Sequence, residues 1–110
     1  MVLIVGGSYQ GKIEFAKEYF PGSFVFDKLH LFIKQCLEED KSEAQILEEI
    51  RKRIQTGDWV IISDELGNGI VPMDEGDVRW REVTGRILIE LAREADRVYR
   101  VILGMGQRIK

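Results

Sequence analysis

The sequence contains a single cysteine, a single histidine and two prolines among its 110 residues. With Cys36 as its one cysteine, the chain cannot form an internal disulfide, which fits a reducing cytosol. The formal net charge is only −3, so the composition gives no overall basic field of the kind that binds nucleic acid. The sequence has no apolar run near the roughly 20 residues of a membrane helix, and its N-terminus lacks the basic flank of a signal peptide. We therefore expect a cytoplasmic protein with no membrane span and no nucleic-acid partner.

Hydrophobic residues make up 45% of the chain and charged residues 32%, which is typical of a folded globular protein. A length of 110 residues matches one hydrophobic core of the usual size. The chain is not divided by any stretch rich in proline, glycine and serine. We therefore predict a single domain over residues 1–110.

Short apolar runs alternate with segments of helical periodicity along the chain. The predicted strands are residues 2–5, 24–26, 59–62 and 98–103, with a short edge strand at 107–110. The predicted helices are residues 12–20, 27–37, 43–56 and 74–95. Apolar strands that alternate with helices favour a mostly parallel sheet with helices on both faces. Ligands bind such sheets at the carboxyl ends of the strands, which here are residues 6–12, 27–30 and 63–69.

Three of the predicted helices begin with a residue that suits an N-cap. Asp27 and Asp74 each precede a helical stripe, and Ser42 with Gln45 forms a capping-box pair. Cys36 falls on the apolar stripe of its helix, which predicts a core residue rather than an activated thiolate.

Residues 6–12 have the spacing of a phosphate-binding loop, a glycine followed by four residues and then Gly-Lys. Glycines let consecutive backbone N–H groups surround phosphate oxygens, and the start of the following helix adds positive potential. Lys12 is expected to reach the outer phosphates and to stabilise charge on a transferred group. A plain glycine-rich turn is the alternative. The predicted nucleotide-binding residues are Gly6, Gly7, Ser8, Tyr9, Gln10, Gly11, Lys12 and Ile13.

The residue after the lysine of such a loop is normally Ser or Thr, whose hydroxyl holds Mg²⁺ beside the phosphates. Here it is Ile13, which has no oxygen. Because Mg²⁺ offsets charge as a phosphoryl group moves, this loss should weaken transfer more than nucleotide binding. Ser8 and a water molecule are both open as substitutes. We expect ATP or GTP as the nucleotide, with weakened Mg²⁺ binding.

Two acidic residues, Asp64 and Glu65, follow the predicted strand 59–62. An acidic residue at this place in phosphate-loop proteins holds Mg²⁺. We predict that one of the two holds Mg²⁺ or a substrate hydroxyl, and we assign Glu65 a catalytic role beside Lys12. An exposed acidic loop or a helix-end cap explains the pair equally well.

A more specific pattern lies in the C-terminal half. Residues 65–72 read Glu-Leu-Gly-Asn-Gly-Ile-Val-Pro, which looks like the Asn-Glu-Val-Gly-x-Gly-Ile-Val-Pro signature of the adenosylcobinamide kinase/adenosylcobinamide-phosphate guanylyltransferase family of cobalamin biosynthesis. Residues 80–82 and 85–86 resemble the family's Phe-Arg-Asp and Gly-Arg, and residues 6–12 match its Gly-Gly-x-x-x-Gly-Lys. The sequence therefore resembles this family over residues 2–12 and 63–110, as a shortened member.

The resemblance implies a fold like that of the RecA-like phosphate-loop ATPases and a homo-oligomer, a trimer. It also implies two reactions, phosphorylation of a hydroxyl on adenosylcobinamide and transfer of GMP through a guanylylated histidine. Family members are longer, and the stretch that holds this histidine corresponds to residues 24–58, so we expect a fold truncated in the middle. His30 lies in Asp-Lys-Leu-His-Leu-Phe, which does not match the family's histidine segment. We assign it no nucleophile role.

His30 falls off the apolar stripe of its helix, which predicts a surface residue. Arg81 and Arg86 occupy positions that match the family and are candidates for contacts to phosphate or substrate, from a neighbouring subunit. Ion pairs with the acidic middle of the chain explain them equally well. Trp59 and Trp80 are predicted to pack in the core or an interface.

These features favour an enzyme that uses ATP or GTP to phosphorylate adenosylcobinamide, without guanylyl transfer. A second hypothesis is a catalytically weakened relative that binds nucleotide and acts as a regulatory or binding module. A third is a phosphoryl transferase for an unrelated small substrate.

Overall fold

The computed structural model of the protein describes residues 1–66 and 74–110. Residues 67–72 of the family-like signature lie outside the described residues, as do residues 67–69 of the predicted third ligand-binding segment. The described elements follow one another as β1 (Val2–Gly6), α1 (Lys12–Tyr19), β2 (Phe24–Phe26), α2 (Leu29–Glu38), α3 (Glu43–Arg53), β3 (Trp59–Asp64), α4 (Glu75–Glu94), β4 (Arg97–Ile102) and β5 (Met105–Arg108).

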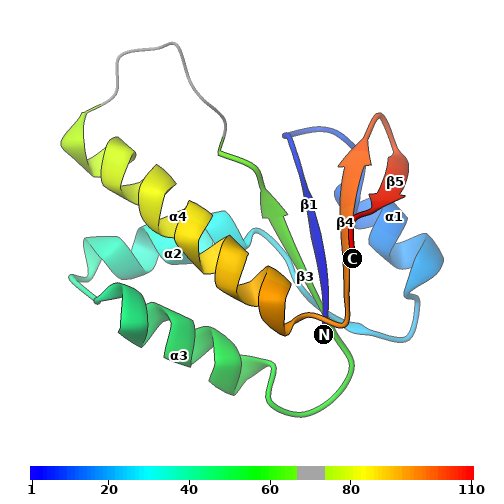
Figure 1. Cartoon of the computed structure of the whole chain (residues 1–110), viewed down its shortest axis with the longest axis horizontal. Coiled ribbons are helices and arrows are strands. Elements are labelled where there is room, and N and C mark those ends of the chain that lie inside the picture. Colours follow the sequence, from blue (N-terminus) through cyan, green and yellow to red (C-terminus); the bar gives the residue numbers. More distant parts are fainter. Residues whose placement is uncertain (67–73) are drawn as a thin grey trace.

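The strands form one sheet in the order β2-β3-β1-β4-β5. The pairs β2–β3, β3–β1 and β1–β4 are parallel, and β5 alone runs antiparallel to its neighbour. Helices α2, α3 and α4 cover one face, and α1 covers the other (Figure 1). The predicted α/β fold, a mostly parallel sheet with helices on both faces, is confirmed. The predicted C-terminal edge strand is also present and begins at Met105.

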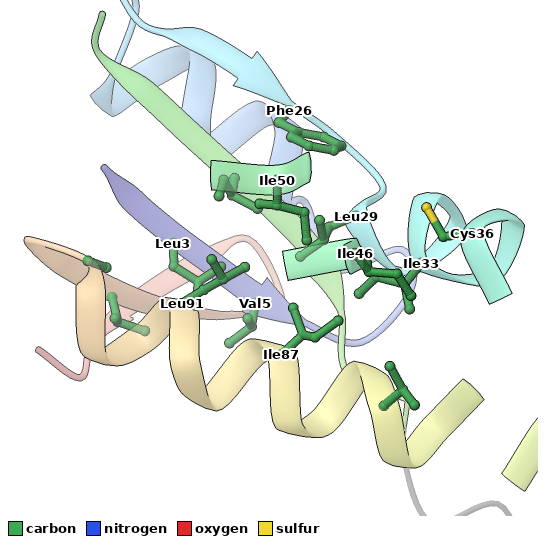
Figure 2. Packing of buried hydrophobic residues seen from close by; sticks show 14 residues of the cluster. Leu3, Val5, Phe26, Leu29, Ile33, Cys36, Ile46, Ile50, Ile87 and Leu91 are labelled. Carbon is green, nitrogen blue, oxygen red and sulfur yellow. The ribbon is translucent and has the colours of Figure 1, made fainter. Parts of the chain in front are cut away.

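The central strand β1 is buried along its whole length. Successive side chains of a strand point to opposite faces of its sheet. Leu3 and Val5 accordingly belong to the larger core cluster beneath α2, α3 and α4 (Figure 2), and Val2 and Ile4 belong to a smaller cluster beneath α1. The continuous apolar run that predicted a buried strand therefore supplies both cores.

Local capping signals gave two correct helix starts and one wrong one. Ser42 and Gln45 form the predicted capping box, and the Asp74 carboxylate accepts the N–H of Asp77 at 2.8 Å. The prediction that Asp27 caps α2 is wrong, because the N-cap of α2 is Lys28. Lys28 has a left-handed backbone with φ 54°, and its N–H donates to Asp27 at 2.8 Å.

Three further side chains, Cys36, Trp59 and Trp80, were predicted to pack in the core or an interface. Cys36 is buried, as its stripe predicted. Trp59 and Trp80 are partly buried against the larger core. Among the helices of the described residues, none is long and apolar enough to cross a membrane.

Candidate nucleotide site

The segment from Gly6 to Lys12 joins the carboxyl end of β1 to the first turn of α1. Its N-cap residue, Gly11, has φ 88°, a left-handed backbone that glycine adopts without strain. Gly6 meets a second constraint, because a Cβ on it would lie 2.5 Å from the carbonyl oxygen of Val101. Both glycines are thus required by the shape of the loop. The first N–H groups of a helix lack partners within it and favour anions, so this loop presents donors to a phosphate.

A cleft of about 440 Å³ opens beside this loop. It is lined by residues 8–14 of the loop and α1, by residues 27, 28, 30 and 31 at the start of α2, and by residues 62 and 64 of β3. The three strand ends that were predicted to bind ligand, those of β1, β2 and β3, therefore meet in one cleft, the third of them through Asp64. This is the geometry expected at the carboxyl edge of a parallel sheet.

The side chain of Lys12 is the main positive charge that faces this cleft from the loop. It is only 8% exposed, and its Nζ lies 2.6 Å from the carbonyl oxygen of Gly7 and 2.7 Å from Oδ1 of Asp64. The ammonium group is thus held beneath the loop by one carbonyl and one carboxylate. An outer phosphate on the loop would bring a second anion to the same ammonium.

Asp64, rather than Glu65, is the carboxylate at the centre of the cleft. Its Oδ2 accepts the hydroxyl proton of Ser8 at 2.7 Å while Oδ1 pairs with Lys12. Burial alone would raise the pKa of Asp64, but the hydrogen bonds from Lys12 and Ser8 and the nearby positive charge outweigh it, so its pKa lies below the ordinary value. The carboxylate is therefore charged at neutral pH.

His30 is buried against this carboxylate, so the prediction of a surface histidine is wrong. It is 8% exposed. Its Nδ1 accepts the backbone N–H of Asp64 at 3.1 Å, and its Nε2 lies 3.5 Å from Asp64 Oδ2. Burial lowers the pKa of His30 more than the charge of Asp64 raises it, so the ring is neutral near pH 7. A neutral ring that accepts at Nδ1 carries its proton on Nε2, on the side of the carboxylate.

Glu65 lies one residue beyond the end of β3. Its backbone N–H donates to the carbonyl oxygen of Gly6 at 2.8 Å, and its side chain accepts from the guanidinium of Arg100 at 3.1 Å. Arg100 was not among the predicted site residues, because it lies in the middle of β4 without a motif around it. Glu65 is therefore beside the loop, and its predicted catalytic role stays a prediction.

Two of the arginines of α4, Arg81 and Arg86, were predicted to contact phosphate or substrate. Arg86 pairs with Glu43 at 2.8 Å across α3 and α4, which is the ion pair with the acidic middle that the sequence left open. Neither Arg86 nor Arg81 is among the described residues that line the cleft. Their suggested contact with phosphate or substrate in a neighbouring subunit stays a prediction.

The oxygen atoms of the cleft fit a Mg²⁺ ion that is bound mainly by phosphates. Ile13 lines the cleft without an oxygen, whereas Ser8 and Asp64 place a hydroxyl and a carboxylate side by side. Within residues 1–66 and 74–110, no group of three or more His, Cys, Asp or Glu side chains is arranged to hold a metal ion. Mg²⁺ commonly needs one or two carboxylates, with waters and substrate phosphates supplying the rest. Asp64 and Ser8 are the residues suited to that part.

Comparison with known proteins supplies the family. Residues 21–109 match the sequence model of the family described as cobinamide kinase / cobinamide phosphate guanyltransferase. The chain belongs to this family. The matched range takes in β2–β5 and α2–α4, and it begins after the phosphate loop, so the interpretation of the loop itself depends on its own sequence and geometry.

Two curated relatives carry the name bifunctional adenosylcobalamin biosynthesis protein CobU. The protein from Salmonella typhimurium is 39% identical over 51 residues, and the one from Escherichia coli is 37% identical over 51 residues. Each match takes in 46% of this chain and 28% of the relative. The chain therefore matches less than a third of the length of either relative, and the family resemblance seen in the sequence is confirmed.

Proposed function

We propose that this protein binds Mg²⁺-ATP or Mg²⁺-GTP at residues 6–13 and transfers the terminal phosphoryl group to a hydroxyl of adenosylcobinamide. The observation that carries the proposal is the contact of Asp64 with both Lys12 and Ser8 of the glycine-rich loop. Membership of a cobinamide kinase family supports the choice of substrate.

In the proposed reaction the loop N–H groups and Lys12 hold the β- and γ-phosphates, so that charge on the transferring group is stabilised. The bond from the γ-phosphorus to the β–γ bridging oxygen breaks, and a bond from the γ-phosphorus to the substrate oxygen forms. The nucleoside diphosphate leaves, and the hydroxyl proton is released to water. Asp64 and Ser8 would help to hold Mg²⁺, which would offset the negative charge of the phosphates. Asp64 orients the hydroxyl of Ser8 and the ammonium of Lys12, and its low pKa makes it a poor proton acceptor.

The test is product formation by the purified chain with Mg²⁺-ATP or Mg²⁺-GTP and adenosylcobinamide. Lys12→Ala should abolish the phosphorylated product, because it removes the one ammonium held beneath the loop. Lys17→Ala is the matched control, since Lys17 is an exposed lysine in the last turn of the same helix. Product that persists in Lys12→Ala would contradict the proposal.

A binding module is the second candidate function, and Ile13 favours it. A loop that retains its glycines and Lys12 but lacks the usual hydroxyl should hold nucleotide better than it transfers phosphate. Lys12-dependent nucleotide binding without any product would favour this function over the kinase.

We propose that guanylyl transfer is absent, because the single histidine is already bonded to Asp64. Incubation with GTP labelled on the α-phosphate tests this. A covalent label on the protein that His30→Ala removes would overturn it.

A further inference from the structure

The turn between β4 and β5 is fastened to the phosphate loop. The side-chain oxygen of Gln10 accepts the N–H of Leu103 at 2.7 Å, and its backbone carbonyl accepts the N–H of Gly104 at 2.7 Å. The contact is close, since a Cβ on Gly11 would lie 3.2 Å from the Cα of Gly104. The end of the loop and the turn of this hairpin therefore form one continuous surface.

A second cavity, of about 390 Å³, begins at this turn and runs between α1 and the hairpin. It is lined by Phe15, Tyr19, Tyr99, Gly104, Met105 and Gly106. The ring of Phe15 lies 4.6 Å from that of Tyr19 and 5.4 Å from that of Tyr99, measured between centroids. The hairpin can approach this closely because Gly106 has no side chain, since a Cβ there would lie 2.2 Å from the Phe15 ring. The cavity is thus an aromatic slot of a size that suits a small ligand.

Two side chains leave apolar surface open at this slot. Tyr19 is 60% exposed although its ring contacts that of the buried Phe15. Met105 is 68% exposed and lines the same cavity as Phe15. An exposed tyrosine ring presents a face on which a planar base can stack, and a methionine thioether adapts to aromatic surfaces. These are the side chains that an aromatic ligand would cover.

We propose that this aromatic slot, residues 15, 19, 99 and 104–106, binds the purine base of the nucleotide whose phosphates lie on residues 6–12. The inference rests on the proposed function, because it needs phosphates on the loop. Base and phosphates are joined through one ribose, so the base must lie next to the loop, and the slot starts where Gly104 touches Gly11. A third hollow, lined by Ile89, Val98 and Ile109 among others, is apolar but lies on the α4 side of the sheet and has no ring in its lining.

In the described sheet β5 is an edge strand. The backbone N–H and C=O groups on the outer side of an edge strand have no neighbouring strand to pair with. Met105 and Gly106 of β5 line the slot, so groups of this kind lie beside a base bound there. The hairpin thus offers a stacking surface and hydrogen-bonding groups together.

The experiment compares calorimetric binding of Mg²⁺-ATP, Mg²⁺-GTP and inorganic tripolyphosphate to the full chain. Tyr19→Ser should weaken the tighter of the two nucleotides about tenfold, as expected for loss of one base-stacking ring, and leave tripolyphosphate unchanged. Tyr19→Phe should keep the nucleotide affinity, because the ring remains. Ile89→Ser is the matched control, an exposed apolar side chain removed from the far face of the sheet. Met105→Ser is a second slot variant and should weaken nucleotide binding in the same selective way.

The possible failures can be told apart. If wild type does not bind tripolyphosphate, or Lys12→Ala binds it equally well, the proposed function fails and this inference fails with it. If tripolyphosphate binding depends on Lys12 but Tyr19→Ser and Met105→Ser bind nucleotide like wild type, the base lies elsewhere and only this inference is overturned. Equal weakening of nucleotide and tripolyphosphate would overturn it as well, because the slot would then act through the loop.

Discussion

The ion pair between Lys12 and Asp64 should have a coupling energy that is large for a protein of 110 residues. The perturbation is a double-mutant cycle of Asp64→Asn, Lys12→Met and the two together. Asn is close in shape to Asp and can still accept from Ser8, and Met keeps most of the apolar stem of lysine without its charge. The cycle therefore removes the charges while it preserves most of the packing.

The magnitude follows from burial. The Nζ and Oδ1 atoms are 2.7 Å apart, and the side chains are 8% exposed for Lys12 and 21% exposed for Asp64. Exposed pairs contribute at most about 1 kcal/mol, whereas breaking a buried pair costs about 3–5 kcal/mol. This pair lies between those limits, so we expect a coupling of about 2 kcal/mol. Asp64→Asn should be the more costly single change. It leaves the ammonium of Lys12, the more buried of the two charges, with the Gly7 carbonyl as its one partner among residues 1–66 and 74–110.

The assay is urea unfolding of the four proteins, with thermal melting as a second measure. Asp64→Asn loses this coupling of about 2 kcal/mol, so at roughly 4 °C for each kcal/mol it should melt about 8 °C below wild type. The double variant should recover most of that loss, because the uncompensated ammonium is gone. A coupling below about 0.5 kcal/mol, or a double variant less stable than Asp64→Asn, would refute the reasoning.

Three further predictions concern the same edge of the sheet. Burial alone would raise the pKa of Asp64, but the hydrogen bonds from Lys12 and Ser8 outweigh it and lower the pKa. The contribution of Asp64 to stability is therefore complete above the ordinary pKa of 3.8 and is lost as pH falls through the folded pKa. Urea unfolding in steps from pH 6 to pH 3 should therefore show a decline that is smaller in Asp64→Asn. Gly6→Ala should lower the free energy of unfolding by about 2 kcal/mol, because the new methyl group meets the Val101 carbonyl. Gly7→Ala has room for the methyl group and should change the free energy of unfolding little. Equal effects of the two variants in chemical denaturation would contradict the close approach of Gly6 to Val101. His30→Leu should cost about 1–3 kcal/mol, since it leaves the Asp64 N–H without its acceptor, and His30→Asn should recover at least half of that, which the same unfolding curves would show.

Features that depend on neighbouring residues in the chain could be predicted. The capping box of Ser42 and Gln45 spans three residues, so its geometry is set locally. The continuous apolar run of β1 and the apolar stripe that holds Cys36 each predicted buried residues correctly. The parallel sheet follows from their alternation with helices.

Features that depend on where elements meet could not be predicted. His30 lies in the first turn of α2, and its direction depends on the left-handed backbone of Lys28, which no helical stripe encodes. The choice of Asp64 over Glu65 depends on which face of β3 each side chain leaves, and the two candidates are adjacent in sequence. The contact of Gln10 with Leu103 spans 93 residues and has no motif at either end.

The place of β1 in the sheet has a consequence for how the chain matures during translation. Although β1 comes first, its two neighbours are β3 and β4, and β4 begins only at Arg97. A nascent chain that has not yet exposed β4 leaves one side of β1 without its hydrogen-bond partners, which is a surface open to wrong pairing. The loop that ends β1 is braced by Leu103 and Gly104, so it cannot take this shape before β4 and its turn have joined β1. A nucleotide bound at residues 6–12, as proposed, would therefore report that β4 has joined the sheet.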